Sequence, residues 1–269
     1  RGHQTHARTG LPGTVRGHHG GRVISRTYAG ILAAETGAEL TQSFRAPEFL
    51  LPTLALPVAF YMLFGVLMSR GGAAATYLLA TYGIFAVMGP SLFGFGVGVA
   101  GERERGWLEL KRASPAPAST FIGAKLLATI TFAALALMPI YAAAAFMGGV
   151  ALPKVVWLTL FCVHLSAVFP FMLIGLSIGF SFGTNGAVAI ANIVFLSFAV
   201  IGGLWFPATF FPGWLVAISN ALPSFHLAEV ALTVVDAPGD RVAGYHAAVV
   251  VGMTLACAAL AGWTWSRQR

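Results

Sequence analysis

Charged residues are scarce in this chain: only 9% of its 269 residues are Asp, Glu, Lys or Arg. Soluble domains carry about 25% charged residues, so this shortage excludes an ordinary water-soluble globule. The two cysteines, Cys162 and Cys257, each lie inside an apolar run and do not indicate a disulfide framework. The sequence also has no GxxxxGK[ST] motif. No lysine is therefore placed to reach the terminal phosphates of ATP by that route.

Hydrophobic residues, by contrast, are abundant, at 57% of the chain. Windows of about 20 mainly apolar residues, the length that a spanning helix needs, occur six times. They cover approximately residues 50–68, 73–100, 120–150, 155–180, 187–206 and 244–265. Prolines inside several windows predict kinks, which membrane helices tolerate. We therefore predict an all-α polytopic membrane protein with six transmembrane helices.

The basic residues indicate which way the chain is oriented in the membrane. With the amino terminus inside, thirteen of the sixteen Lys and Arg residues fall on the cytoplasmic side. This bias follows the positive-inside rule, and six spans place both termini in the cytoplasm. The net charge of +7 then has a membrane explanation, and no nucleic-acid partner is expected.

Three regions outside the spans complete the predicted organisation. Residues 1–22 are rich in Gly, His and Arg, and we expect a disordered or non-native extension. Residues 23–46 predict a cytoplasmic interfacial helix, which leaves 47–269 as the six-span domain. Residues 205–235 are too broken to span the membrane and too apolar for a solvated loop. They predict short outer re-entrant helices before the last span.

The internal loop 101–119 carries the densest group of charges, beside tryptophan and leucine. A short helix with charges on one face and apolar residues on the other suits contact with a partner protein at the membrane surface. The alternative is a solvated loop that obeys the positive-inside rule. The residues of interest are Glu102, Arg103, Glu104, Arg105, Gly106, Trp107, Leu108 and Glu109.

The run ERERGWLELKRASP, from Glu102 to Pro115, resembles the ERE(R/K)GTLE…L…SP segment of type-2 ABC exporter permeases. The segment ALPSFHLAEVA, from Ala221 to Ala231, is similar to the LPxxH element before the last span of that family. Trp107 departs from the pattern, because the family usually has a small polar residue there. The similarity covers about residues 23–269.

This resemblance implies a permease without an ATPase site or cofactor of its own. ATP would bind a separate ABC ATPase subunit, and residues 102–109 would form the coupling element seated in that subunit. A second permease subunit, most simply an identical one, would complete the pathway in a bacterial inner membrane. Hydrophobic or amphipathic cargo, such as a drug or lipid, suits the apolar spans. The alternatives are an ATPase-independent secondary carrier and a membrane assembly or scaffold protein.

Polar residues within or beside the spans are candidates for the pathway. They are His164, Asn192, His226 and Glu229. Intramembrane polar groups often serve function, although a lone His or Asn also bridges helices. No Asp, Glu, Lys or Arg lies in the middle of a span, which argues against a proton- or sodium-coupled carrier.

Two motifs match enzyme signatures in the wrong structural context. Residues 96–101 match the dinucleotide-binding pattern GxGxxG, but they end an apolar helix instead of following a strand. Residues 175–179 match the nucleophile-elbow pattern GxSxG in the middle of a span. An intramembrane serine hydrolase using Ser177 with His226 or His246 is the enzyme alternative. Close helix packing explains both sets of glycines.

Overall fold

The computed structural model describes residues 28–44, 47–69, 71–107, 110, 118–239 and 242–267. These residues form helices joined by short connections, with no strand in the described ranges. The helices are α1 (Tyr28–Phe44), α2 (Pro47–Phe60), η1 (Tyr61–Met68), α3 (Ala73–Glu104), α5 (Ala118–Phe146), α6 (Lys154–Ser166), α7 (Val168–Ser181), α8 (Thr184–Ile201), η2 (Ala208–Phe210), α9 (Gly213–Ser219), α10 (Pro223–Val234) and α11 (Ala243–Ser266).

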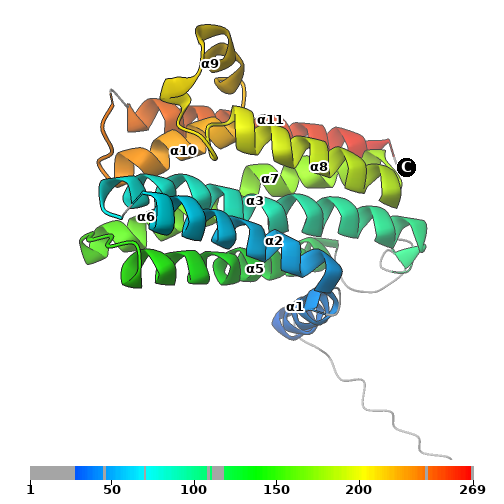
Figure 1. The fold of residues 1–269 in the computed structure, drawn as a ribbon. Helices are drawn as coiled ribbons and strands as arrows, with labels where there is room; N and C mark the ends of the chain where they lie inside the picture. The colour runs from blue at the N-terminus through cyan, green and yellow to red at the C-terminus, as the bar shows by residue number, and fades with distance from the viewer. Residues whose placement is uncertain are drawn as a thin grey trace, which may run out of the picture.

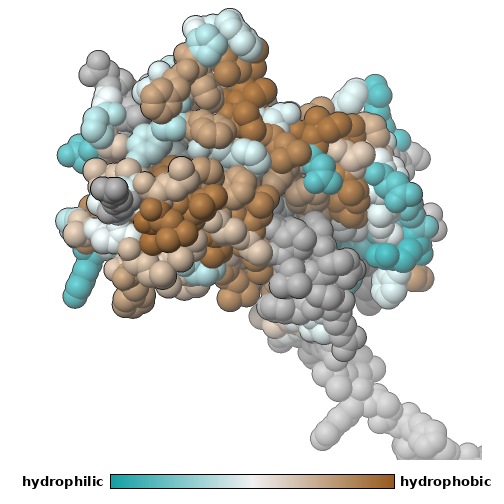
Figure 2. All heavy atoms as spheres, in the orientation of Figure 1, coloured by the Kyte–Doolittle hydropathy of each residue, from teal (hydrophilic) through white to brown (hydrophobic). Residues whose placement is uncertain are grey.

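The helices run back and forth between two ends of one bundle (Figure 1). Five described segments, namely α3, α5, α6 with α7, α8 and α11, are long and apolar enough to cross a membrane. Helices α2 and η1, with 14 and 8 residues, cover the position of the predicted first span, and their apolar part, Leu54–Met68, is shorter than these five segments. The surface is apolar along much of the bundle, and hydrophilic residues gather toward its two ends (Figure 2). The predicted all-α polytopic membrane fold is confirmed.

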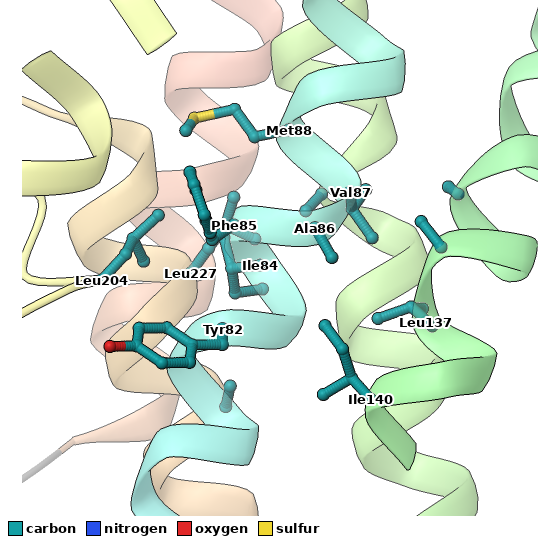
Figure 3. Close-up of a cluster of buried hydrophobic side chains, with 14 of the residues drawn as sticks. Tyr82, Ile84, Phe85, Ala86, Val87, Met88, Leu137, Ile140, Leu204 and Leu227 are labelled. Atoms are coloured by element: carbon teal, nitrogen blue, oxygen red, sulfur yellow. The ribbon is translucent and has the colours of Figure 1, made fainter. Parts of the chain in front are cut away.

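Helix α3 is the centre of the bundle. Along its most apolar 18 residues, 83% are buried, compared with 11% for α11. Its side chains meet those of α5 and α10 and the segment after α8 (Figure 3). The cluster includes Ile84, Phe85, Val87, Met88, Leu137, Ile140, Leu204 and Leu227. Because lipid is as apolar as these side chains, close packing and polar contacts must hold the helices together.

The glycines of the two enzyme-like motifs pack against each other where α3 meets α7. A Cβ atom on Gly175 would lie 2.6 Å from the Leu92 carbonyl oxygen, and one on Gly179 would lie 2.5 Å from the Gly96 carbonyl oxygen. Close packing of α3 against α7 therefore explains Gly175 and Gly179, and Gly96 is their contact on α3. Gly98, which has GxxxG spacing with Gly94, would have no heavy atom within 4 Å of its Cβ.

Two predicted segments depart from a single regular helix in the structure. The predicted fourth span is divided at Ala167 into α6 and α7, three residues before Pro170. In residues 205–235, α9 and α10 meet at an angle of 94°, and α9 projects from the bundle (Figure 1). Pro223 begins α10, where its missing N–H costs nothing.

Candidate functional site

The motif residues 102–107 lie where α3 ends. The helix stops at Gly106, whose φ of 71° is the left-handed conformation that glycine adopts easily. Its N–H donates to the carbonyl of Arg103 at 3.1 Å, and the N–H of Leu110 donates to the carbonyl of Gly106 at 3.3 Å. The chain therefore turns sharply and resumes helical geometry. Helix α1 and the carboxyl end of α11 lie toward the same end of the bundle (Figure 1).

A buried ion cluster joins this end of α3 to two other helices. The ammonium group of Lys125 on α5 donates to Glu102 on α3 at 2.5 Å and to Glu39 on α1 at 2.7 Å. The three side chains are only 6–14% exposed. Removing one partner from such a buried arrangement costs far more than breaking a surface pair. The cluster therefore fixes α1, α3 and α5 to one another.

Arg103 and Glu104, adjacent in sequence, hold the turn between α7 and α8. The guanidinium group of Arg103 donates to the carbonyl of Phe180 and, at 2.8 Å, to that of Phe182. The carboxylate of Glu104 accepts the N–H of Thr184 at 3.0 Å and also the Thr184 hydroxyl. We call Glu39, Glu102, Arg103, Glu104, Lys125 and Thr184 the polar end cluster.

Both charges of this turn are placed where the helix dipoles favour them. Arg103 lies at the carboxyl end of α7, where terminal carbonyls lack partners within the helix. Glu104 lies at the amino end of α8, whose N-cap residue, Gly183, provides no side-chain hydrogen bond. A cation at a helix carboxyl terminus and an anion at an amino terminus are both stabilising. The two motif residues therefore act as caps for helices that begin or end about 80 residues later in the chain.

Gly183 provides a test of the Glu104 cap. A Cβ atom at this position would overlap Glu104 Oε1, while the φ of −69° accommodates alanine. In Gly183→Ala the carboxylate must move away, so hydrogen exchange at the start of α8 should accelerate roughly three- to ten-fold. Gly252→Ala is the control, because nothing lies within 4 Å of its Cβ. Unchanged exchange in Gly183→Ala would show that Glu104 does not cap α8.

The rest of the motif faces outward. Arg105 is exposed, and the side chains of Trp107 and Leu110 are 53% and 66% exposed. Leu108 and Glu109, which the sequence places in the same coupling element, lie outside the described residues. The motif thus divides into an anchored part, made of the buried Glu102, the half-buried Arg103 and the exposed Glu104, and an exposed part beside it that includes Trp107.

The four predicted pathway residues are not brought together. His164 is fully buried in α6, where its Nε2 hydrogen bonds with the Ala80 carbonyl and its Nδ1 with the Tyr141 hydroxyl, both at 2.9 Å. This geometry bridges α3, α5 and α6. Asn192 is exposed on α8, where its amide donates to the Val188 carbonyl of the same helix at 2.9 Å.

His226 and Glu229 lie on α10, away from the polar end cluster. One ring nitrogen of His226 contacts the Asn220 carbonyl at 3.0 Å, and the other contacts His246 Nδ1 at 2.8 Å. Ser177 lies within helix α7, and its hydroxyl donates to the Leu173 carbonyl at 2.9 Å. The strained strand-to-helix turn of a nucleophile elbow is therefore not formed at Ser177. Across the described ranges, no group of three His, Cys, Asp or Glu side chains is placed to hold a metal.

The sequence does not predict which residues contact Glu102 and Glu104. In the sequence Lys125 is recognisable only as a basic residue on the cytoplasmic side, and Glu39 only as part of an amphipathic helix. A signal is available, because a lysine inside an apolar helix is costly unless an acid pairs with it. Thr184 gives no signal beyond its position near the start of a predicted helix.

The fold and the polar end cluster define a polytopic helical membrane protein with an anchored segment exposed at one end. Residues 32–235 match the family model described as ABC-2 type transporter, and the chain belongs to this family. The Bacillus subtilis (strain 168) protein named transport permease YvfS is 27% identical over 200 residues, which are 73% of this chain and 82% of that protein. The predicted family is confirmed, and the chain is a transport permease subunit.

Proposed function

We propose that this chain is the membrane-spanning subunit of an ATP-driven exporter in a bacterial inner membrane. ATP binds and is hydrolysed in a separate ABC ATPase subunit, which docks on residues 102–110 at the cytoplasmic end of the bundle. Two permease subunits, identical in the simplest case, form the pathway with two ATPase subunits. The cargo is a hydrophobic or amphipathic molecule, in keeping with the apolar composition of the spans.

The observation that carries this proposal is the division of the motif into anchored and exposed parts. Glu102, Arg103 and Glu104 contact α5 and both helices of the α7–α8 turn, and Glu102 is linked to α1 through Lys125, whereas Trp107 and Leu110 are exposed. A force applied at the exposed residues is delivered through short polar contacts to four neighbouring helices. Transport driven by a separate ATPase requires a connection of this kind, because a solvated loop would move without displacing the helices.

Trp107 is the predicted anchor for the ATPase. Large aromatic residues often dominate the binding free energy of an interface, so Trp107→Ala should weaken association about ten-fold. The measurement is co-purification with the ATPase subunit, together with the change in ATP hydrolysis when permease is added. Trp214→Ala on α9 is the matched control, because its side chain is 67% exposed near the other end of the bundle.

The outcome can contradict the proposal in two ways. If the wild-type chain does not associate with any ABC ATPase, ATP hydrolysis in such a subunit does not drive transport by this chain. Equal association of Trp107→Ala and Trp214→Ala would show that the ATPase docks elsewhere. The double variant Glu102→Ala with Glu104→Ala should also lose export. If export remains intact in this variant, the anchored residues do not transmit movement from the ATPase.

A further inference from the structure

A cavity opens at the end of the bundle opposite to the polar end cluster. Its volume is about 1080 Å³, and it lies between η1, the start of α3, and the segments that follow α8 and α10. Helix α3 lines it with residues between Ala73 and Tyr82 and contributes to the polar end cluster through Glu102–Glu104. Six aromatic side chains form much of the wall, namely Phe64, Tyr77, Tyr82, Trp205, Phe206 and Phe210.

Asp236, on the wall of this cavity, occupies a backbone position that usually takes glycine. It follows α10 with a φ of 54°, the only positive φ of a non-glycine residue in the described ranges. Its N–H donates to the Thr233 carbonyl at 3.1 Å, and the N–H of Ala237 donates to the Leu232 carbonyl at 3.0 Å. These two bonds define a Schellman motif, in which the left-handed residue is normally Gly and sometimes Asn.

The charge of Asp236 is also unfavourable at this position. A carboxylate at the carboxyl end of a helix adds to the negative end of the helix dipole. Within the described part of the chain, no hydrogen bond or ion pair engages this carboxylate. Asp236 is exposed, so its carboxylate is hydrated and adds one negative charge to the wall of the cavity.

Trp205 is a firmly packed aromatic residue of the same wall. Its ring is held edge-on by Phe60 and Phe85, at centroid distances of 4.9 and 5.5 Å. The backbone carbonyl of Trp205 accepts the Tyr82 hydroxyl at 3.4 Å, yet among the described residues its buried Nε1 donates to nothing. Less than 1 Å² of this nitrogen is accessible, so a ligand in the cavity does not reach it, and Trp205 contributes its aromatic ring to the wall.

We propose that this cavity binds an amphipathic organic cation. The aromatic wall holds the apolar body and attracts its positive charge through the ring faces. The carboxylate of Asp236 sets the sign of the charge, and the cavity wall includes no Lys, Arg or His among the described residues. The role of this cation as cargo at the outer end of the pathway rests on the proposed export function, whereas binding itself does not.

Rhodamine 123 is a suitable probe, since it is an aromatic cation with an ester carbonyl. The full-length chain in phosphatidylcholine nanodiscs is titrated with the dye, and fluorescence anisotropy reports binding. Asp236→Asn should weaken binding about ten-fold, because it removes one charge in contact with the ligand.

The controls separate loss of the site from loss of the fold. Asparagine tolerates the left-handed conformation and removes the unfavourable charge, so Asp236→Asn should unfold at the same or a higher temperature. Glu35→Gln neutralises a carboxylate on α1, distant from the cavity, and should leave binding unchanged. Rhodamine 110 has a free carboxylate in place of the methyl ester and should bind at least about ten-fold more weakly.

Two results would overturn the proposal. If Asp236→Asn binds rhodamine 123 as tightly as the wild type, the carboxylate does not select the ligand. If both dyes bind equally, the cavity accepts apolar groups without regard to charge, as it would an acyl chain. The assay contains no ATPase, so the failure of cation binding is distinguishable from the failure of the proposed ATP-driven export.

Discussion

Lys125→Met is expected to lower the free energy of unfolding by roughly 3 kcal/mol, because it removes the ammonium group that two buried carboxylates share. Glu39 and Glu102 accept from Lys125 at 2.7 and 2.5 Å in a region from which water is largely excluded. Methionine keeps much of the length and apolar stem of lysine, so lost packing contributes little. The measurement is an equilibrium unfolding titration with SDS in mixed micelles.

Two further variants test this explanation. Lys154→Met removes a lysine that is exposed at the start of α6, and a surface substitution of this kind should change stability by less than about 0.5 kcal/mol. Adding Glu39→Gln and Glu102→Gln to Lys125→Met should recover most of the loss, since uncharged polar groups are cheaper to bury than carboxylates. Equal stabilities of Lys125→Met and Lys154→Met would mean that the buried cluster does not hold the helices together.

Gly179→Ala is expected to lower the free energy of unfolding by roughly 2 kcal/mol through overpacking. The added Cβ would lie 2.5 Å from the Gly96 carbonyl oxygen. That atom belongs to the backbone of α3 and cannot rotate away, so α3 and α7 must separate. The neighbouring contacts of α3 with α5 and α8 would then also be disturbed. The same unfolding titration measures the loss.

Gly98→Ala is the matched control for this effect. Gly98 lies on α3 close to Gly96, but an added Cβ there would have no heavy atom within 4 Å. Alanine in a helix interior is favoured over glycine by up to about 1 kcal/mol, so this variant should be as stable as the wild type or more so. If Gly179→Ala matched Gly98→Ala, the close approach of the two backbones would not contribute to stability.

Features that depend on local composition can be predicted from the sequence. Apolar length predicts the spans to within a few residues, because a hydrocarbon layer imposes one length on every crossing. The Pro and aromatic residues after Trp205 correctly predict a broken segment. The interruption at Ala167 lies within the 28-residue segment Lys154–Ser181, three residues before Pro170, and agrees with the kink that a proline predicts in a span.

Features that depend on residues distant in the chain cannot be predicted in the same way. Glu39 and Lys125 are 86 residues apart, and Glu104 and Thr184 are 80 residues apart. Charge counting identifies the segment that contains Glu104 but not its partner, since pairing depends on how the helices pack. In the sequence Asp236 resembles any solvated outer residue, because its left-handed backbone has no signature there.

The two sites of this permease lie at opposite ends of one helix. Helix α3 has 32 residues, a length of about 48 Å at 1.5 Å per residue, and its middle is enclosed by α5, α7 and α8. If the helix tilts about that enclosed midpoint by about 5°, its two tips move roughly 2 Å in opposite directions. Such a tilt would couple the end of α3 that carries residues 102–105 to the aromatic cavity without any change within the helix.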